Sequence, residues 1–164
     1  MGAFTAAVGG KVYVIGGMNN NAALSVNEIY NPATNTWSTG APMPTARWLG
    51  GTAVVNNIVY CIAGSSTNAA FTNVEAYDPS TNTWSTKAPF PTFNNSVYAV
   101  TVNNIIYMVG GFNAAAGGRL KTLDSCNPAT DTWTMLPSLA VGKSQSALGV
   151  FGQMIVAGGG LLEN

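Results

Sequence analysis

A glycine-containing dipeptide recurs at nearly equal intervals along this chain of 164 residues. Gly16-Gly17 is followed by Ala63-Gly64, Gly110-Gly111 and Gly158-Gly159, which are 47, 47 and 48 residues apart. Two aromatic-rich columns keep the same period: Tyr30, Tyr77 and Cys126 form one, and Trp37, Trp84 and Trp133 form the other, seven residues later. A period near 50 residues is typical of a propeller or a solenoid, so the chain is predicted to be an array of similar units.

Each unit carries the pattern of two β-hairpins. In the first unit the β-prone runs 4–8 and 12–15 flank the turn Gly9-Gly10, and the next two units place Asn56-Asn57 and Asn103-Asn104 at this turn. Asn suits the same turn because it tolerates a positive φ better than most residues with a side chain. A second pair of short β-prone runs follows in every unit, joined by a turn with Asn-Pro or Asp-Pro. Four strands per unit, with no helical periodicity, describe a propeller blade.

The repeated residues also identify a family. The double glycine after an apolar strand, the tyrosine followed by Asn/Asp-Pro-x-Thr-Asn/Asp-Thr-Trp, and the link Met43 to Arg47 resemble the kelch repeat over essentially the whole chain. This resemblance implies an all-β fold of β-propeller blades, each with four antiparallel strands. We expect a single kelch-repeat array over residues 1–164, with blades at about 1–40, 44–88 and 91–136 and a half blade at 143–160.

About three and a half blades would not close a ring. Kelch propellers usually have about six or seven blades, and an open array leaves an unpaired strand edge at each end. We therefore expect the chain to be a segment of a longer propeller. The alternative is that copies associate to complete a ring or a fibre, which would make the protein a homo-oligomer.

The composition limits the partners. Only 7% of residues are charged, against about 25% in average soluble domains, and the formal net charge is zero. With no basic cluster, we expect neither nucleic-acid binding nor attraction to an anionic membrane. The chain has no apolar run of membrane-spanning length, and we expect no signal peptide in it. Low charge and the sequon Asn94-Asn95-Ser96 lean toward an extracellular setting, but the compartment stays open.

Residues for catalysis and metal binding are scarce. Histidine is absent, which removes the commonest metal ligand and general base. Cys61 and Cys126 stand in different repeats and are expected to be small core hydrophobes. The glycine pairs follow strands but open no helix, so they are strand ends and not phosphate loops. We predict no catalytic residue, no metal site and no cofactor.

An acidic residue recurs at the same position of each complete repeat. This acidic column consists of Glu28, Glu75 and Asp124, each two residues before the tyrosine column. We expect these carboxylates to accept hydrogen bonds within their blades and not to catalyse.

The resemblance implies a ligand surface on one face, formed by the loop between the second and third strands of each blade and by the link into the first strand. The candidate residues in the loops are Asn19, Asn68, Phe71, Phe112 and Arg119, and those in the links are Arg47, Trp48, Asn94 and Lys143. Cations beside an indole would suit an acidic peptide or a sugar carboxylate. The alternative is that Arg47 and Lys143 hydrogen-bond carbonyl groups of the links or loops.

Three functions are compatible with the sequence. The first is a non-catalytic binding and scaffold module that engages a protein or glycan partner through this face. The second is a segment of a kelch-type enzyme acting on an acidic sugar, as in proteins resembling sialic-acid mutarotases, although the loops contain no carboxylate. The third is a structural fragment that completes a ring by pairing its strand edges.

Overall fold

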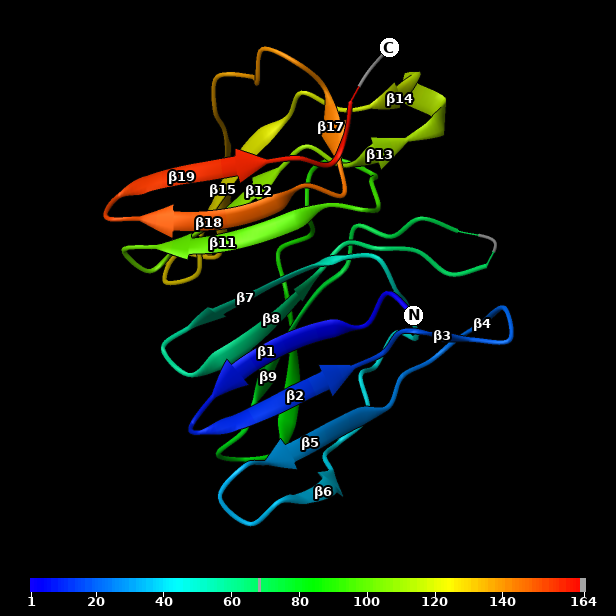
Figure 1. Cartoon of the computed structure of the whole chain (residues 1–164), viewed down its shortest axis with the longest axis vertical. Helices are drawn as coiled ribbons and strands as arrows, with labels where there is room; N and C mark the ends of the chain where they lie inside the picture. Colours follow the sequence, from blue (N-terminus) through cyan, green and yellow to red (C-terminus); the bar gives the residue numbers. More distant parts are fainter. Residues whose placement is uncertain (68, 163–164) are drawn as a thin grey trace.

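The fold consists of three four-stranded antiparallel sheets and a two-stranded sheet, stacked side by side (Figure 1). The computed structural model describes residues 1–67 and 69–162, with Leu162 described for its backbone alone. Blade 1 contains β1 (Phe4–Val8), β2 (Lys11–Ile15), β5 (Asn27–Asn31) and β6 (Thr36–Thr39). Blade 2 contains β7 (Gly51–Val55), β8 (Ile58–Ile62), β9 (Val74–Asp78) and β10 (Thr83–Lys87).

Blade 3 and the half blade follow the same plan. Blade 3 contains β11 (Tyr98–Val102), β12 (Ile105–Val109), β15 (Leu123–Asn127) and β16 (Thr132–Met135). The half blade is the hairpin of β18 (Ala147–Phe151) and β19 (Met154–Gly158). This confirms the predicted all-β fold of four-stranded antiparallel blades as a partial propeller.

The smaller elements lie in the loops and links between these strands, except for the last one, which follows β19. They are β3 (Met18–Asn19), β4 (Ala22–Ala23), β13 (Phe112–Asn113), the 3-10 turn η1 (Ala114–Ala116), β14 (Gly118–Arg119), β17 (Lys143–Ser144) and β20 (Leu161–Leu162).

The first hairpin of each blade is closed by two residues in the left-handed region. The pairs are Gly9-Gly10, Asn56-Asn57 and Asn103-Asn104, with φ between 50° and 72°. This conformation matches the right-handed twist of the two strands that the turn joins, which is why Gly and Asn occupy it. The sequence therefore specifies the turn through residue type.

A tryptophan of each later blade holds the chain that leaves the blade before it. Trp84 Nε1 donates to the carbonyl of Ala41 at 2.9 Å, and Trp133 Nε1 donates to that of Ala88 at 3.1 Å. Trp37, the first member of the column, is 61% exposed because no blade packs on that side among the described residues. The tryptophan column therefore packs between two blades only at Trp84 and Trp133.

A row of main-chain hydrogen bonds crosses from blade to blade near the first strands. Leu49 donates to Gly2, Ser96 donates to Leu49 and Gln145 donates to Ser96, at 2.9, 2.7 and 3.3 Å. All four residues have a φ between 52° and 69°. Because only glycine adopts this conformation without strain, the three other side chains carry a local cost that the shared hydrogen bonds offset.

The fourth glycine pair is displaced by one residue from its predicted place. Gly159-Gly160 has the positive φ values of the earlier pairs, whereas Gly158 lies inside β19 opposite Ala147. The spacing from Gly110 is therefore 49 residues and not 48, because the loop of blade 3 is longer than those of the first two blades. The predicted pair Gly158-Gly159 was wrong by this one position.

Candidate ligand-binding face

Three loops between second and third strands emerge on the same side of the blades, at the right of Figure 1. Blade 1 contributes the hairpin β3–β4, and blade 2 contributes a loop closed by a bridge between Ser65 and Ala70. In blade 3, β13 and β14 pair so that Phe112 lies opposite Arg119. Asn113 caps the intervening η1 turn by accepting from the N–H groups of Ala115 and Ala116. The loops therefore form one rim.

The links into the first strands join this rim through their backbones. The carbonyl groups of Arg47, Asn94 and Lys143 accept hydrogen bonds from Gly17, Gly64 and Gly111 of the preceding blades, at 3.0, 3.4 and 2.9 Å. The column that the sequence aligned is thus a seam between blades. Its backbone position is structural in every repeat, so only the side chains differ in what they offer a ligand.

Arg47 is buried and its guanidinium is used by the fold. The side chain is 0% exposed, and it donates to the carbonyl groups of Ala63, Cys61 and Thr45 at 2.9, 2.8 and 3.1 Å. It also forms an ion pair with Glu75. Of the two predicted roles for Arg47, the geometry supports the structural one, because no face of the guanidinium is left for a ligand.

Two other link candidates are also largely withdrawn from the surface. Asn94 is 1% exposed and donates to the carbonyl of Gly110 at 3.1 Å, so the folded chain does not offer the sequon amide to a glycosylating enzyme. Trp48 is half-buried, and its indole N–H is buried without a hydrogen-bond partner among the described residues. Trp48 offers at most part of its ring to a partner.

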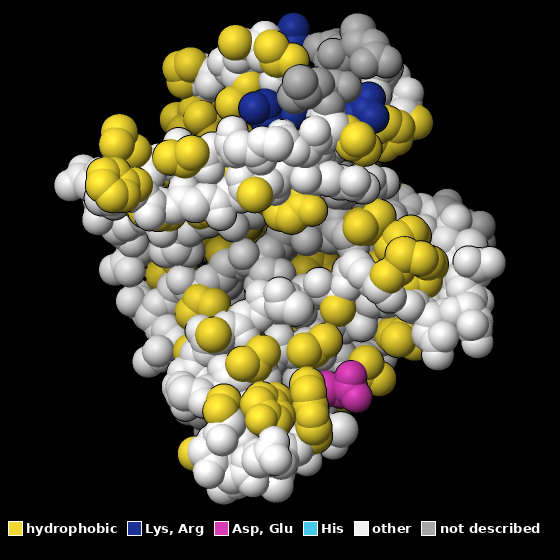
Figure 2. Space-filling view, in the orientation of Figure 1, with side chains coloured by type: hydrophobic (Ala, Val, Ile, Leu, Met, Phe, Trp, Pro, Cys, Tyr) yellow, Lys and Arg dark blue, Asp and Glu magenta, His cyan; other side chains and the backbone are white. Residues whose placement is uncertain are grey.

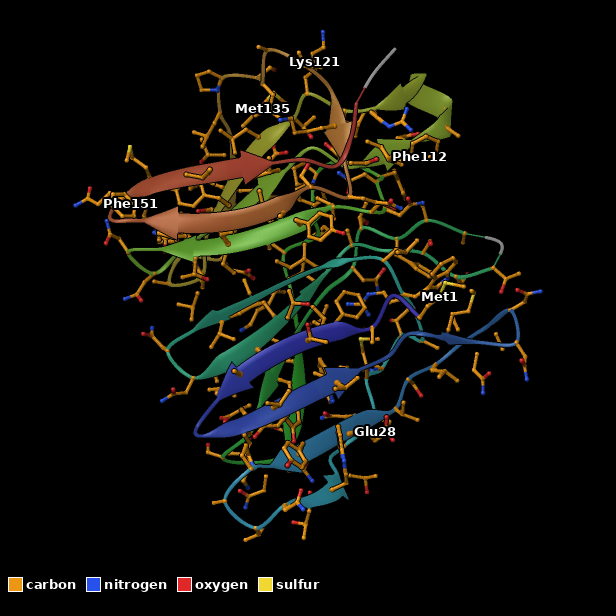
Figure 3. All side chains as sticks on the ribbon, in the orientation of Figure 1. Met1, Glu28, Phe112, Lys121, Met135 and Phe151 are labelled. Carbon is orange, nitrogen blue, oxygen red and sulfur yellow. The ribbon has the colours of Figure 1, made fainter. Side chains whose placement is uncertain are left out.

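The remaining candidates lie at the surface of the rim. Asn19 is exposed, whereas Phe71, Phe112, Arg119 and Lys143 are half-buried. Figure 3 labels Phe112 on the loop side and Phe151 at the opposite end of the strands. The predicted residue Asn68 lies outside the described residues.

Charge is distributed unevenly over this surface. Figure 2 shows Lys and Arg side chains at the end formed by blade 3 and the half blade, and an acidic side chain at the other end, where Figure 3 labels Glu28. The Arg119 Nε atom is buried and has no hydrogen-bond partner in the described part of the chain. The fold therefore does not use this guanidinium as it uses that of Arg47.

The acidic column has a different environment in each blade. Glu75 is 2% exposed and accepts from the Thr45 hydroxyl at 2.7 Å in addition to its ion pair, whereas Glu28 is exposed on β5. Asp124 is 0% exposed, and neither of its carboxylate oxygens has a hydrogen-bond partner among the described residues. Burial raises the pKa of the Asp124 carboxyl from its ordinary value of 3.8. The expected role as an acceptor within the blade holds for Glu75 and not for Asp124.

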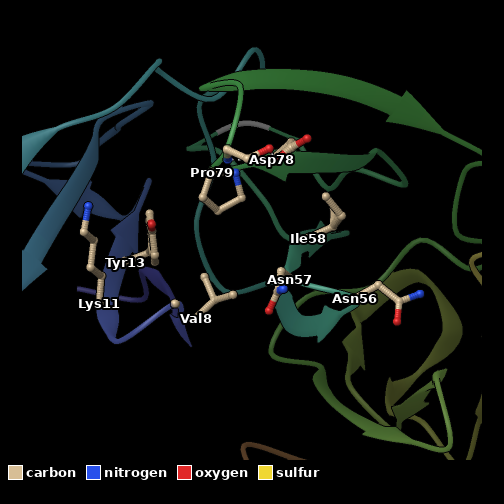
Figure 4. Close-up of a pocket in the computed structure, with 10 residues that line it drawn as sticks. Val8, Lys11, Tyr13, Asn56, Asn57, Ile58, Asp78 and Pro79 are labelled. Carbon is tan, nitrogen blue, oxygen red and sulfur yellow. Dashed lines mark hydrogen bonds between the residues drawn. The ribbon is translucent and has the colours of Figure 1, made fainter.

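A pocket lies at the opposite end of the strands from the rim. It has a volume of about 460 Å³ and is bordered by the hairpin turns of blades 1 and 2, with Lys11 and Asp78 among its residues (Figure 4). A similar groove of about 380 Å³ lies between blades 2 and 3. Such grooves open where two twisted sheets diverge. The sequence did not predict these grooves, although the repeated turn pairs Gly9-Gly10 and Asn56-Asn57 lie at their edges.

The described residues contain neither a cluster of metal-binding side chains nor a membrane-spanning helix. No group of three or more His, Cys, Asp or Glu side chains in residues 1–67 and 69–162 is arranged to hold a metal ion. Over the same part of the chain, no helix has the length and apolar character needed to cross a membrane.

Comparison with known proteins agrees with this architecture. The family model described as the KLHDC2/KLHL20/DRC7 Kelch-repeats domain matches residues 1–160. A solved structure described as "Structure of YjhT" superposes with a TM-score of 0.86 at 20% sequence identity. The alignment covers 97% of this chain and 58% of that chain, so this chain spans little more than half of it. No curated protein matches the sequence.

Proposed function

Because the chain belongs to the Kelch-repeats domain family, we propose that it is a non-catalytic binding module that engages an acidic protein or glycan partner through the loop rim. The observation that carries this proposal is the hairpin β13–β14 of blade 3. It presents Phe112 opposite Arg119, and the fold leaves the guanidinium of Arg119 without a hydrogen bond in the described residues. Arginine is enriched among the residues that dominate binding energy, and both phenylalanine and arginine are enriched at protein interfaces.

A cation near this hairpin supports an acidic partner. Lys143 lies in the link that joins the same blade to the half blade, and its ammonium makes no hydrogen bond or ion pair within the described part of the chain. A guanidinium binds a carboxylate through two parallel hydrogen bonds, whereas an ammonium acts as a point charge. The pair would therefore orient and attract a carboxylate group.

Catalysis is disfavoured by what the rim lacks. The loop segments 18–24, 65–71 and 112–121 contain no Asp, Glu or His, so they offer neither a carboxylate nor an imidazole as a general acid or base. The buried carboxylates of Glu75 and Asp124 lie within the blades and are withdrawn from any substrate on the rim. We therefore prefer the binding role over an enzyme acting on an acidic sugar.

The binding role is tested with two immobilised probes, a glutamate-rich peptide and an oligosaccharide of glucuronic acid. We expect Phe112→Ala and Arg119→Ala each to weaken binding by about tenfold or more, because each removes an anchor of the site. Phe151→Ala and Lys11→Ala are matched controls, since they remove an exposed aromatic ring and a cation from the opposite end of the strands. Equal losses in the controls, or no binding to either probe, would contradict the proposal.

A second candidate function is self-association. The half blade exposes a row of apolar side chains: Val150, Phe151, Met154 and Val156 are 45, 74, 61 and 55% exposed. At the other end of the array, Trp37 lacks the partner that the later tryptophans have. Apolar surface of this kind favours association. Sedimentation at several concentrations tests it: a monomer at all concentrations would exclude association of this chain with itself.

A further inference from the structure

Blade 2 and blade 3 differ at one buried polar position. In blade 2, four oxygen atoms surround the guanidinium of Arg47: the carbonyl oxygens of Ala63, Cys61 and Thr45, and a carboxylate oxygen of Glu75. The single positive charge of the arginine balances the single negative charge of the glutamate. The blade thus buries a neutral pair with its hydrogen bonds satisfied.

Blade 3 keeps the backbone of this arrangement but not the pair. Asn94 replaces the arginine, and its amide donates to Gly110 as Arg47 donates to Ala63. Asp124 replaces the glutamate, and it lies opposite Met108 in the sheet as Glu75 lies opposite Cys61. The two side chains are shorter than those they replace, so neither brings a positively charged group to the position that the Arg47 guanidinium occupies in blade 2.

Three side-chain oxygen atoms of Asn94 and Asp124 have no hydrogen-bond partner among the described residues. They are Oδ1 of Asn94 and both carboxylate oxygens of Asp124, and these two residues are 1% and 0% exposed. In blade 2 the hydroxyl of Thr45 reaches Glu75 at 2.7 Å. Thr92 is the repeat equivalent in blade 3, and no such bond to the shorter Asp124 is formed. A buried carboxylate without any partner is costly, so this position calls for a positively charged group.

We propose that Asp124 and Asn94 bind a monovalent cation such as sodium at the position that the Arg47 guanidinium occupies in blade 2. The ligands are all oxygen atoms, which suits a hard cation. The carboxylate of Asp124 and the Asn94 side-chain oxygen supply the first ligands, and the carbonyl groups of Met108 and Thr92, which are equivalent to those of Cys61 and Thr45 in blade 2, complete the set, because the carbonyl of Gly110 already accepts from Asn94. One carboxylate carries one charge, so a monovalent ion leaves the buried site neutral, as the arginine does in blade 2.

The test measures thermal unfolding of the whole chain in sodium chloride and in choline chloride at equal ionic strength. We expect sodium to raise the midpoint by about 5 °C when it exceeds its dissociation constant a hundredfold, because a ligand that binds only the folded state stabilises it. Asp124→Asn should abolish this response, since it removes the charge. Asn94→Arg combined with Asp124→Glu rebuilds the pair of blade 2, so it should raise the midpoint in choline and remove the difference between the salts.

Each outcome decides the proposal. A sodium response that Asp124→Asn removes supports it, and the rebuilt pair supports it independently if one variant does not fold. Equal midpoints of the wild-type chain in both salts would overturn it and would mean that water or a proton partners the carboxylate. A response to calcium chloride but not to sodium chloride would also overturn it, because the argument from charge requires a monovalent ion.

Discussion

Substitution of Arg47 separates the scaffold role of this residue from a role in binding. Arg47→Ala removes three hydrogen bonds to carbonyl groups and leaves the Glu75 carboxylate, whose side chain is 3% exposed, without its counter-ion. The change also removes the guanidinium from the ring of Phe4, whose centroid lies 5.3 Å away. Breaking a buried ion pair by removing one partner costs about 3–5 kcal/mol. We expect a loss of that size in the free energy of unfolding.

Urea unfolding followed by tryptophan fluorescence measures this loss. The total stability of a domain is about 5–15 kcal/mol, so the midpoint should fall by a large fraction or the chain should fail to fold. Arg119→Ala is the matched control, because it removes the other arginine from a half-buried position where the guanidinium has no bond within the described residues. We expect it to change stability by less than about 0.5 kcal/mol.

The buried ion pair of Arg47 and Glu75 predicts a second effect on stability. Glu75→Gln in the Arg47→Ala background should recover part of the lost stability, because it removes the uncompensated charge. The reasoning is refuted if Arg47→Ala costs less than about 1 kcal/mol and weakens binding of a glutamate-rich peptide, since that combination would identify Arg47 as a ligand contact.

Three further predictions follow from burial. Trp84→Phe should destabilise the fold by about 1 kcal/mol, from the lost indole hydrogen bond, and Trp37→Phe, in the same sequence context, should change the urea midpoint little because Trp37 is exposed. Burial raises the pKa of the Cys61 thiol to about 12 and that of Cys126 to about 11, so neither should react with Ellman's reagent before unfolding. The raised pKa of Asp124 means that the folded state binds a proton at this carboxyl more tightly than the unfolded state does. In choline buffer the free energy of unfolding should therefore fall as the pH rises from about 4. Urea titrations at several pH values measure this fall, and Asp124→Asn should reduce it.

The fold could be predicted from the sequence because the residues that specify it act locally and recur in each unit. Turn residues such as Gly9-Gly10 and Asn56-Asn57 specify their backbone conformation through residue type, and the repeat supplies the rest by analogy. The position of the fourth glycine pair was missed by one residue. A longer loop in blade 3 shifts the register, and a count of residues cannot tell a glycine at a strand end from Gly158 inside the strand.

The site was harder to predict because side-chain burial depends on neighbouring blades. The sequence placed Arg47, Asn94 and Lys143 in one column, and the structure brings their carbonyl groups into one seam, but only Lys143 keeps a partly exposed side chain. The ion pair between Arg47 and Glu75 joins residues 28 positions apart. An acidic column in register with an arginine was a visible sign of such a pair, yet the residues alone could not show that Asp124 is too short to repeat it.

Chemical-shift mapping of the glutamate-rich peptide on the isotopically labelled chain tests the central claim, that the loop rim carries the function and the rest of each blade supports it. Amide resonances of Asn19, Phe71, Phe112 and Arg119 should shift on titration, while those of the hairpin turns bordering the large groove should not. Shifts confined to the turns at residues 9–10 and 56–57 would contradict this account, because they would place the ligand at the opposite end of the blades.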